Sequence, residues 1–210
     1  MKKLSLLISL LIIITACQNN EKEASVEKNQ AVEKQEKKPA FDHKAYKMKG
    51  MLIAKNTFQN FKSKIESIGQ KEGLPSVVHF CNDNAQKLAD SLGKIHKVEI
   101  RRTSHKLRNP DSKPNADQEA VINNYLQLQE DQNKQMEPVI MKDEQGYVHF
   151  YAPIKLKEKC LQCHGQVGKD IHDDVYKVIK EKYPQDKATG FKVGELRGIW
   201  DIKFLEKPGQ

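Results

Sequence analysis

The feature that most constrains this chain is the stretch EKCLQCHGQ at residues 158–166, where two cysteines stand three positions apart and a histidine follows directly. The chain has four cysteines, and two of them, Cys160 and Cys163, lie in this stretch. The spacing brings two thiols and the His164 imidazole within about one turn of backbone. The fold must therefore hold all three groups at one site, and their chemistry depends on the compartment in which the chain resides.

The N-terminus predicts export and lipidation. Two lysines precede an apolar run at residues 4–14, the order of a secretory signal, and the run is too short for a stable membrane span. Residues 14–17, ITAC, resemble the bacterial lipobox, so we expect residues 1–16 to be a lipoprotein signal peptide and Cys17 to be acylated. The alternative is an ordinary secretory signal that ends in cysteine. Either signal exports the chain, and lipidation would anchor it in a membrane, facing the periplasm or the cell exterior.

Composition divides the mature chain into a tether and one domain. Residues 17–47 begin with the cysteine expected to be lipidated and are otherwise almost all charged or polar, which predicts a disordered tether. Residues 48–210 have the length of a single domain. The formal charge is +8, and the basic residues are spread along the chain. The sequence contains no nucleic-acid-binding motif. We therefore expect a basic surface near anionic lipid and no nucleic-acid partner.

Apolar periodicity predicts four helices and a small antiparallel sheet. The helices are expected at residues 51–68, 76–92, 115–128 and 173–182. The first would face the core through Met51, Ala54, Phe58, Phe61, Ile65 and Ile68. Asn115 and Gln118 form a capping-box pattern, and Gly93 would end the second helix. Strands are expected at residues 97–104, in a hairpin at 137–156 that turns at 143–146, and at 196–205, which makes an α+β domain.

The motif Cys160-Leu161-Gln162-Cys163-His164 matches the C-x-x-C-H pattern of covalent haem attachment. Each thiol can form a thioether with one of two vinyl groups on adjacent pyrrole rings, and the histidine then becomes the proximal iron ligand. Zinc would need two further ligands. A redox disulfide would need a thioredoxin-like setting, and a structural disulfide across two residues is strained. The sequence therefore favours one covalently bound haem c per chain.

Three runs, at residues 101–119, 151–165 and 183–202, resemble in sequence order a family of exported single-haem sensor domains, often known only as a domain of unknown function. The resemblance covers roughly residues 75–204. It implies a PAS-like α+β fold, with N-terminal helices, an antiparallel sheet and one covalently bound haem. In characterised relatives a helical cysteine binds the iron on the side away from the motif histidine. The matching residue here is Cys81.

The residues themselves point to the same sixth ligand. Cys81 is the cysteine left over once the lipobox and the motif are assigned, and it lies on the apolar face of its expected helix. Its alternative role is that of a small buried hydrophobe. Other candidates for the ligand are Met136, Met141, His149 and His105.

Arginines in and beside the RRTS…RNP segment, at residues 101–110, are candidates to bind the haem propionates. Arg101, Arg102 and Arg108 carry the forked donors that suit carboxylates. The alternative is that the Asn109-Pro110 segment of this region only builds a rigid turn.

Three functions are compatible with these features. The first is a membrane-tethered redox or gas sensor with His/Cys ligation, without catalytic turnover, that signals to an unidentified protein. The second is an exported electron-transfer cytochrome c. The third, a peroxidase, needs an open iron position that Cys81 would block.

Overall fold

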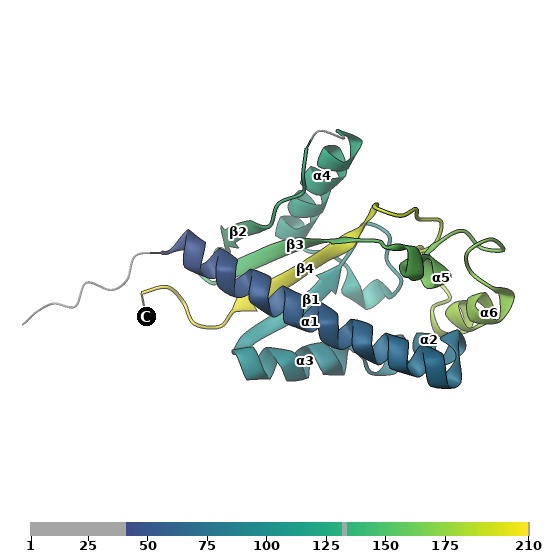
Figure 1. The fold of residues 1–210 in the computed structure, drawn as a ribbon. Helices are drawn as coiled ribbons and strands as arrows, with labels where there is room; N and C mark the ends of the chain where they lie inside the picture. Colours follow the sequence, from purple (N-terminus) through teal and green to yellow (C-terminus); the bar gives the residue numbers. More distant parts are fainter. Residues whose placement is uncertain (1–40, 132–133, 210) are drawn as a thin grey trace, which may run out of the picture. The chain divides into compact units, whose positions relative to one another are not determined.

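A computed structural model describes residues 41–131 and 134–209 (Figure 1). The predicted signal peptide at residues 1–16, the predicted lipidation site Cys17 and the predicted tether up to residue 40 lie outside the described residues. Helix α1 runs from His43 to Glu72, so the folded part begins earlier than the expected boundary at Met48. The Asp42 side chain caps α1 by accepting a hydrogen bond from the Ala45 N–H.

A four-stranded antiparallel sheet forms the centre of the domain. Its strands are β1 (Val98–Thr103), β2 (Val139–Lys142), β3 (Val148–Lys155) and β4 (Leu196–Phe204), in the order β1-β4-β3-β2. The predicted hairpin turns at Asp143–Gly146, where Gly146 has the positive φ of 84° that favours glycine. The expected α+β fold, with N-terminal helices and an antiparallel sheet, is confirmed.

The helices cover the sheet from both faces (Figure 1). Besides α1 they are α2 (Leu74–Asp83), α3 (Ala85–His96), α4 (Ala116–Glu130) and α6 (Asp173–Lys182), with short turns η1 (Pro110–Ser112), η2 (Glu158–Cys160) and α5 (Leu161–His164). Helices α1 and α3 pack on the face that carries Phe150, Trp200 and Ile202. Helix α4, begun by the predicted Asn115–Gln118 capping box, packs on the opposite face, against Tyr151 and Ile199.

The inward face of α1 differs from the predicted stripe. Gly50, Ile53, Thr57 and Phe61 are buried, whereas Met51 and Phe58 are 50% and 37% exposed. The cause is close packing of the helix on strand β3, because a Cβ atom at Gly50 would overlap the Phe150 ring. At this point helix α1 contacts β3 through its smallest residue, Gly50, rather than through its largest apolar residues.

The second predicted helix is two helices. It breaks at Asn84, whose ψ of −15° with φ of −130° leaves helical geometry, and α3 then continues past Gly93 to His96. Lys97 ends α3 in the left-handed conformation, with φ of 55°. The break leaves Cys81 in the last turn of α2, beside the start of α3.

Among the described residues, none of the helices combines the length and hydropathy of a membrane span.

Candidate functional site

A cavity of about 1710 Å³ lies between α1, α2, the sheet and the motif segment. Pockets for small ligands usually measure about 300–1,000 Å³, so this cavity suits a larger group. Its apolar walls come mainly from Phe58, Phe61, Ile65, Leu74, Val77, Val78, Ala85, Ile154, Leu156 and Trp200. Phe58 and Ile65, which α1 does not use in the core, line this cavity instead. Cys81, Cys160, Cys163 and His164 line the same space.

The motif folds as two short turns, η2 and α5. The Cys160 sulfur accepts a hydrogen bond from the Lys157 N–H at 3.4 Å, and the Gly165 N–H donates to the Leu161 carbonyl at 2.7 Å. A Cβ atom at Gly165 would overlap the Asp170 side chain. Glycine at this position therefore leaves the space that the Asp170 side chain occupies beside the backbone after His164.

The His164 ring is held in one tautomer. Its Nδ1 lies 2.9 Å from the Ala188 carbonyl oxygen, which can only accept, so Nδ1 carries the proton. The Arg197 Nε atom, 3.3 Å from Nδ1, therefore cannot donate to it. Burial, and then the charges of Arg197 and Arg108, hold the pKa of His164 well below its ordinary value. The ring is thus neutral, with a lone pair on Nε2, which is the form that binds a metal.

Arg108 fastens the motif to the loop at residues 183–191. Its guanidinium forms an ion pair with Asp186 at 3.2 Å, with the two side chains only 12% and 1% exposed. It also donates to the carbonyls of Cys163, at 2.5 Å, and Ala188, at 3.2 Å. The predicted role of Arg108 was to bind a propionate, but these contacts favour a role in positioning the motif.

Of the five residues considered as a sixth ligand, the structure brings Cys81 alone into the cavity. Met136 and Met141 pack on the α4 face of the sheet. His149 lies between Asp201 and Asp143, at 2.7 and 3.3 Å, and His105 contacts the Phe191 ring.

Cys81 lies half-buried in the cavity wall. Burial raises the pKa of the Cys81 thiol, and the charges of Arg102 and Arg108 partly oppose this rise. The pKa of Cys163 is raised by burial to about 11. Both thiols are therefore protonated at neutral pH before any bond forms to a metal or a vinyl group.

Neither a zinc ligand set nor either kind of disulfide considered for the motif is formed among the described residues. The described cysteines Cys81, Cys160 and Cys163 are free thiols. Across the described ranges, no three or more His, Cys, Asp or Glu side chains converge as a metal-binding group. A zinc site with four protein ligands thus has no ligand set among these residues.

The two arginines of β1, Arg101 and Arg102, point to opposite faces of the sheet. Arg102 is half-buried and lies over the Phe61 and Trp200 rings, with its guanidinium carbon 4.4 and 5.5 Å from their centroids. Strand alternation places Arg101 on the other side, and it is exposed at the rim of the cavity. Of the predicted propionate ligands, Arg102 alone is inside the cavity and free of an acidic partner among the described residues.

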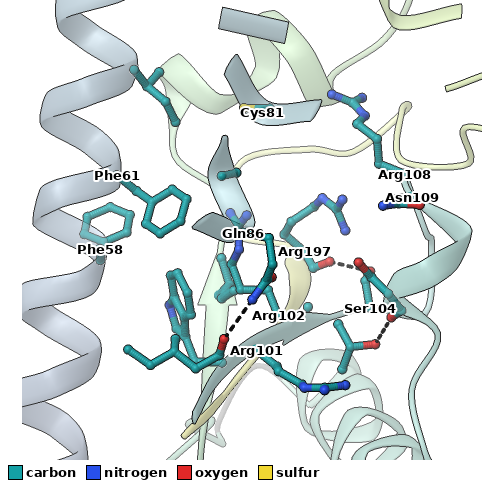
Figure 2. A pocket seen from close by; sticks show the side chains of 18 of the residues that line it. Phe58, Phe61, Cys81, Gln86, Arg101, Arg102, Ser104, Arg108, Asn109 and Arg197 are labelled. Atoms are coloured by element: carbon teal, nitrogen blue, oxygen red, sulfur yellow. Dashed lines mark hydrogen bonds between the residues drawn. The ribbon is translucent and has the colours of Figure 1, made fainter. Parts of the chain in front are cut away.

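Arg197 is a site residue that the sequence analysis missed. The register of β3 with β4 shifts between Ile154 and Lys155, which pair with Gly198 and Leu196 and leave Arg197 as the extra residue of a bulge. The bulge turns Arg197 into the cavity, near Arg102 (Figure 2). Burial and the charges of Arg108 and Arg102 lower the pKa of Arg197 to about 9.

Comparison with known families identifies the chain. The model of the Tll0287-like family matches residues 16–204. The chain belongs to the Tll0287-like family. This confirms the family resemblance found in the sequence. A solved structure described as the cyanobacterial heme-protein Tll0287 is similar, with 23% identity over 71% of this chain and 96% of that chain and a TM-score of 0.47. No curated protein compared with the chain matches it.

Proposed function

We propose that this member of the Tll0287-like family is a c-type haem protein with one haem in the cavity. Cys160 and Cys163 would attach the haem by thioether bonds, and His164 and Cys81 would bind the iron. The observation that carries the proposal is that all four side chains line one cavity, with the His164 ring already neutral. The similar solved protein is also described as a heme protein.

The bound haem would supply an iron that changes oxidation state and can bind a small gas. The role of the chain is to control access to that iron. The Cys81 sulfur can bind as a thiolate, and since burial favours its protonated form, a proton can displace it. Cys81 also lies in the last helical turn before the break at Asn84. A ligand that can leave suits a redox or gas sensor.

The alternative function is electron transfer in the same compartment. A carrier would keep Cys81 bound in both oxidation states. In either role we expect no catalytic turnover and no nucleic-acid partner. We further propose that acylated Cys17 anchors the exported chain to a membrane, where it meets an unidentified redox or signalling protein.

Covalent attachment can be tested directly. Protein produced with the haem-attachment machinery should retain haem in a denaturing gel, and Cys160→Ala with Cys163→Ala should abolish the haem stain. The matched control is Cys81→Ala, which should keep the stain because Cys81 forms no thioether. A colourless, folded wild-type protein with stoichiometric zinc would contradict the proposal.

A further inference from the structure

Two guanidinium groups face the cavity without an acidic partner. Arg108 is neutralised by Asp186. Among the residues that the structure describes, Arg102 has only ring contacts, with Phe61 and Trp200. Arg197 donates to the Lys106 carbonyl at 3.1 Å and contacts no carboxylate in the same part of the chain. Neither guanidinium group therefore contacts a carboxylate among the described residues, although acidic side chains lie elsewhere in the cavity lining.

Binding of a group in the cavity would remove water from these two guanidinium groups. Both arginines are half-buried, and the surface left to them faces the cavity (Figure 2). A bound group would displace the water that now solvates them. Buried charges in proteins are paired or hydrogen-bonded, because an isolated buried charge is strongly destabilising. The group that fits this cavity should therefore bring anionic atoms to Arg102 and Arg197.

The backbone is arranged to place Arg197 in this position. Plain alternation from Trp200 would put Arg197 on the α4 face, and the bulge reverses it. The next residue must be glycine, because a Cβ atom at Gly198 would overlap the Thr103 carbonyl oxygen on β1. The Ser104 hydroxyl donates to the carbonyl of Arg197 itself. Irregular backbone is thus used to bring a second cation beside Arg102.

We propose that Arg102 and Arg197 form a subsite for two carboxylates of the bound group, the two propionates of haem. This inference rests on the proposed function. Two guanidinium forks match two carboxylates in charge and in hydrogen-bonding geometry. The assignment replaces the predicted set of Arg101, Arg102 and Arg108.

The test compares iron mesoporphyrin with its dimethyl ester, which lacks the two negative charges. Mesoporphyrin has ethyl groups in place of vinyls, so it cannot form thioethers and both affinities are reversible. The full mature chain, produced without the attachment machinery, is titrated with each porphyrin by absorbance. Wild type should bind the diester about tenfold more weakly or worse, the loss expected from one charge-assisted hydrogen bond or more. Arg102→Gln and Arg197→Gln should each reduce this preference, and Arg101→Gln, on the exposed side of β1, should keep it.

Each outcome is decisive. Equal binding of the two porphyrins by wild type would overturn the carboxylate subsite and leave the haem proposal standing, and this comparison needs no variant to fold. A preference that survives in both folded Gln variants, judged by circular dichroism, would overturn the assignment to these arginines. Failure of wild type to bind either porphyrin would overturn the proposed function itself.

Discussion

At the scale of single residues, Cys81 decides between the two proposed functions. It lies among Val77, Val78 and Ala85 in an apolar wall, where burial raises the pKa of its thiol. A thiolate at this position needs the iron to stabilise it. With the proposed haem bound, the same burial would let a proton compete with the iron for the Cys81 sulfur once the iron is reduced.

The prediction for Cys81 is spectroscopic. Ferric wild-type holoprotein should show a low-spin thiolate spectrum, and Cys81→Ala should turn it high-spin or let another residue bind. Carbon monoxide should bind the reduced wild type, because the protonated Cys81 sulfur leaves the iron. Absorbance and electron paramagnetic resonance spectra check both statements. If the variant matches wild type in both oxidation states, Cys81 is a packing residue.

His149 forms a second buried network, on the α4 face of the sheet. Its Nδ1 lies 2.7 Å from Asp201, which also accepts a hydrogen bond from Gln118, and Lys203 lies 3.8 Å from Asp143. Burial alone would lower the pKa of His149, but the contacts with Asp201 and Asp143 outweigh it and raise that pKa. The imidazolium form thus contributes to folding.

This network predicts how stability depends on pH. Because the folded-state pKa of His149 exceeds that of the unfolded chain, its stabilisation is full below about pH 6.5 and is lost as pH rises through the folded pKa. His149→Gln should lower the free energy of unfolding by about 1–3 kcal/mol at pH 5.5 and by less at pH 8.5. Denaturant unfolding at both pH values checks this. The exposed His172→Gln should show no such difference, and an equal loss at both pH values would contradict it.

Candidate site residues were easier to predict from their identity and spacing than the direction in which each side chain points. The motif, the leftover cysteine and Arg102 were found from the sequence because each depends on identity and spacing. Arg197 was not found, because a one-residue bulge reverses its direction and nothing in its immediate neighbours except Gly198 signals the change. Arg108 was also named from the sequence, but its ion pair with Asp186 was not predicted, because Asp186 is 78 positions away in sequence.

At the scale of elements, the contact of α1 with β3 fixes one wall of the cavity. Gly50 is buried against the Phe150 ring, and about three to four helical turns later the same helix carries Phe61 and Ile65 into the cavity. The height of the helix above the sheet at Gly50 therefore sets the width of the cavity beyond it.

We predict that Gly50→Ala destabilises the domain although alanine favours helices. The added methyl group would push α1 away from Phe150, at a cost of about 1–3 kcal/mol in the free energy of unfolding. The matched control is Gly69→Ala on the same helix, where the nearest atom to a new Cβ is a Val77 methyl at 3.6 Å. That variant should gain up to about 1 kcal/mol. Thermal unfolding of the two variants gives opposite shifts, and a stabilised Gly50→Ala would contradict the packing argument.

Periodicity located most elements, including α6 at residues 173–182, and failed where tertiary contacts override it. The break at Asn84 interrupts an apolar pattern that continues through Ala85 and Leu92. The pattern continues because both α2 and α3 need an inward face, even though they are separate helices. Periodicity likewise did not predict which face of α1 is buried. Large apolar residues were expected to face the core, but Phe58 faces the cavity instead.

At the scale of the whole molecule, we propose that the N-terminus determines where the domain is located. Cys17→Ser should remove the acceptor for the lipid, so the chain should be released from the membrane or retained as precursor. Detergent phase partition and mass spectrometry of the mature N-terminus check this. Acylation adds tens of methylene groups, each favouring the lipid phase by about 0.8 kcal/mol, so the difference in partition should be nearly complete. An unmodified N-terminus at another residue in wild type would contradict the prediction.

If haem is attached covalently as proposed, the loop at residues 183–191 would also set an order of events during biogenesis. Its Gly190 and Phe191 N–H groups donate to the carbonyls of Gly165 and His164, and Arg108 ties it to the Cys163 carbonyl. Once these bonds form, residues 160–164 are no longer an extended peptide that an attachment enzyme could grip. Haem would therefore have to be joined to the newly exported chain before this loop docks, and a chain that folds first would be trapped as a colourless by-product.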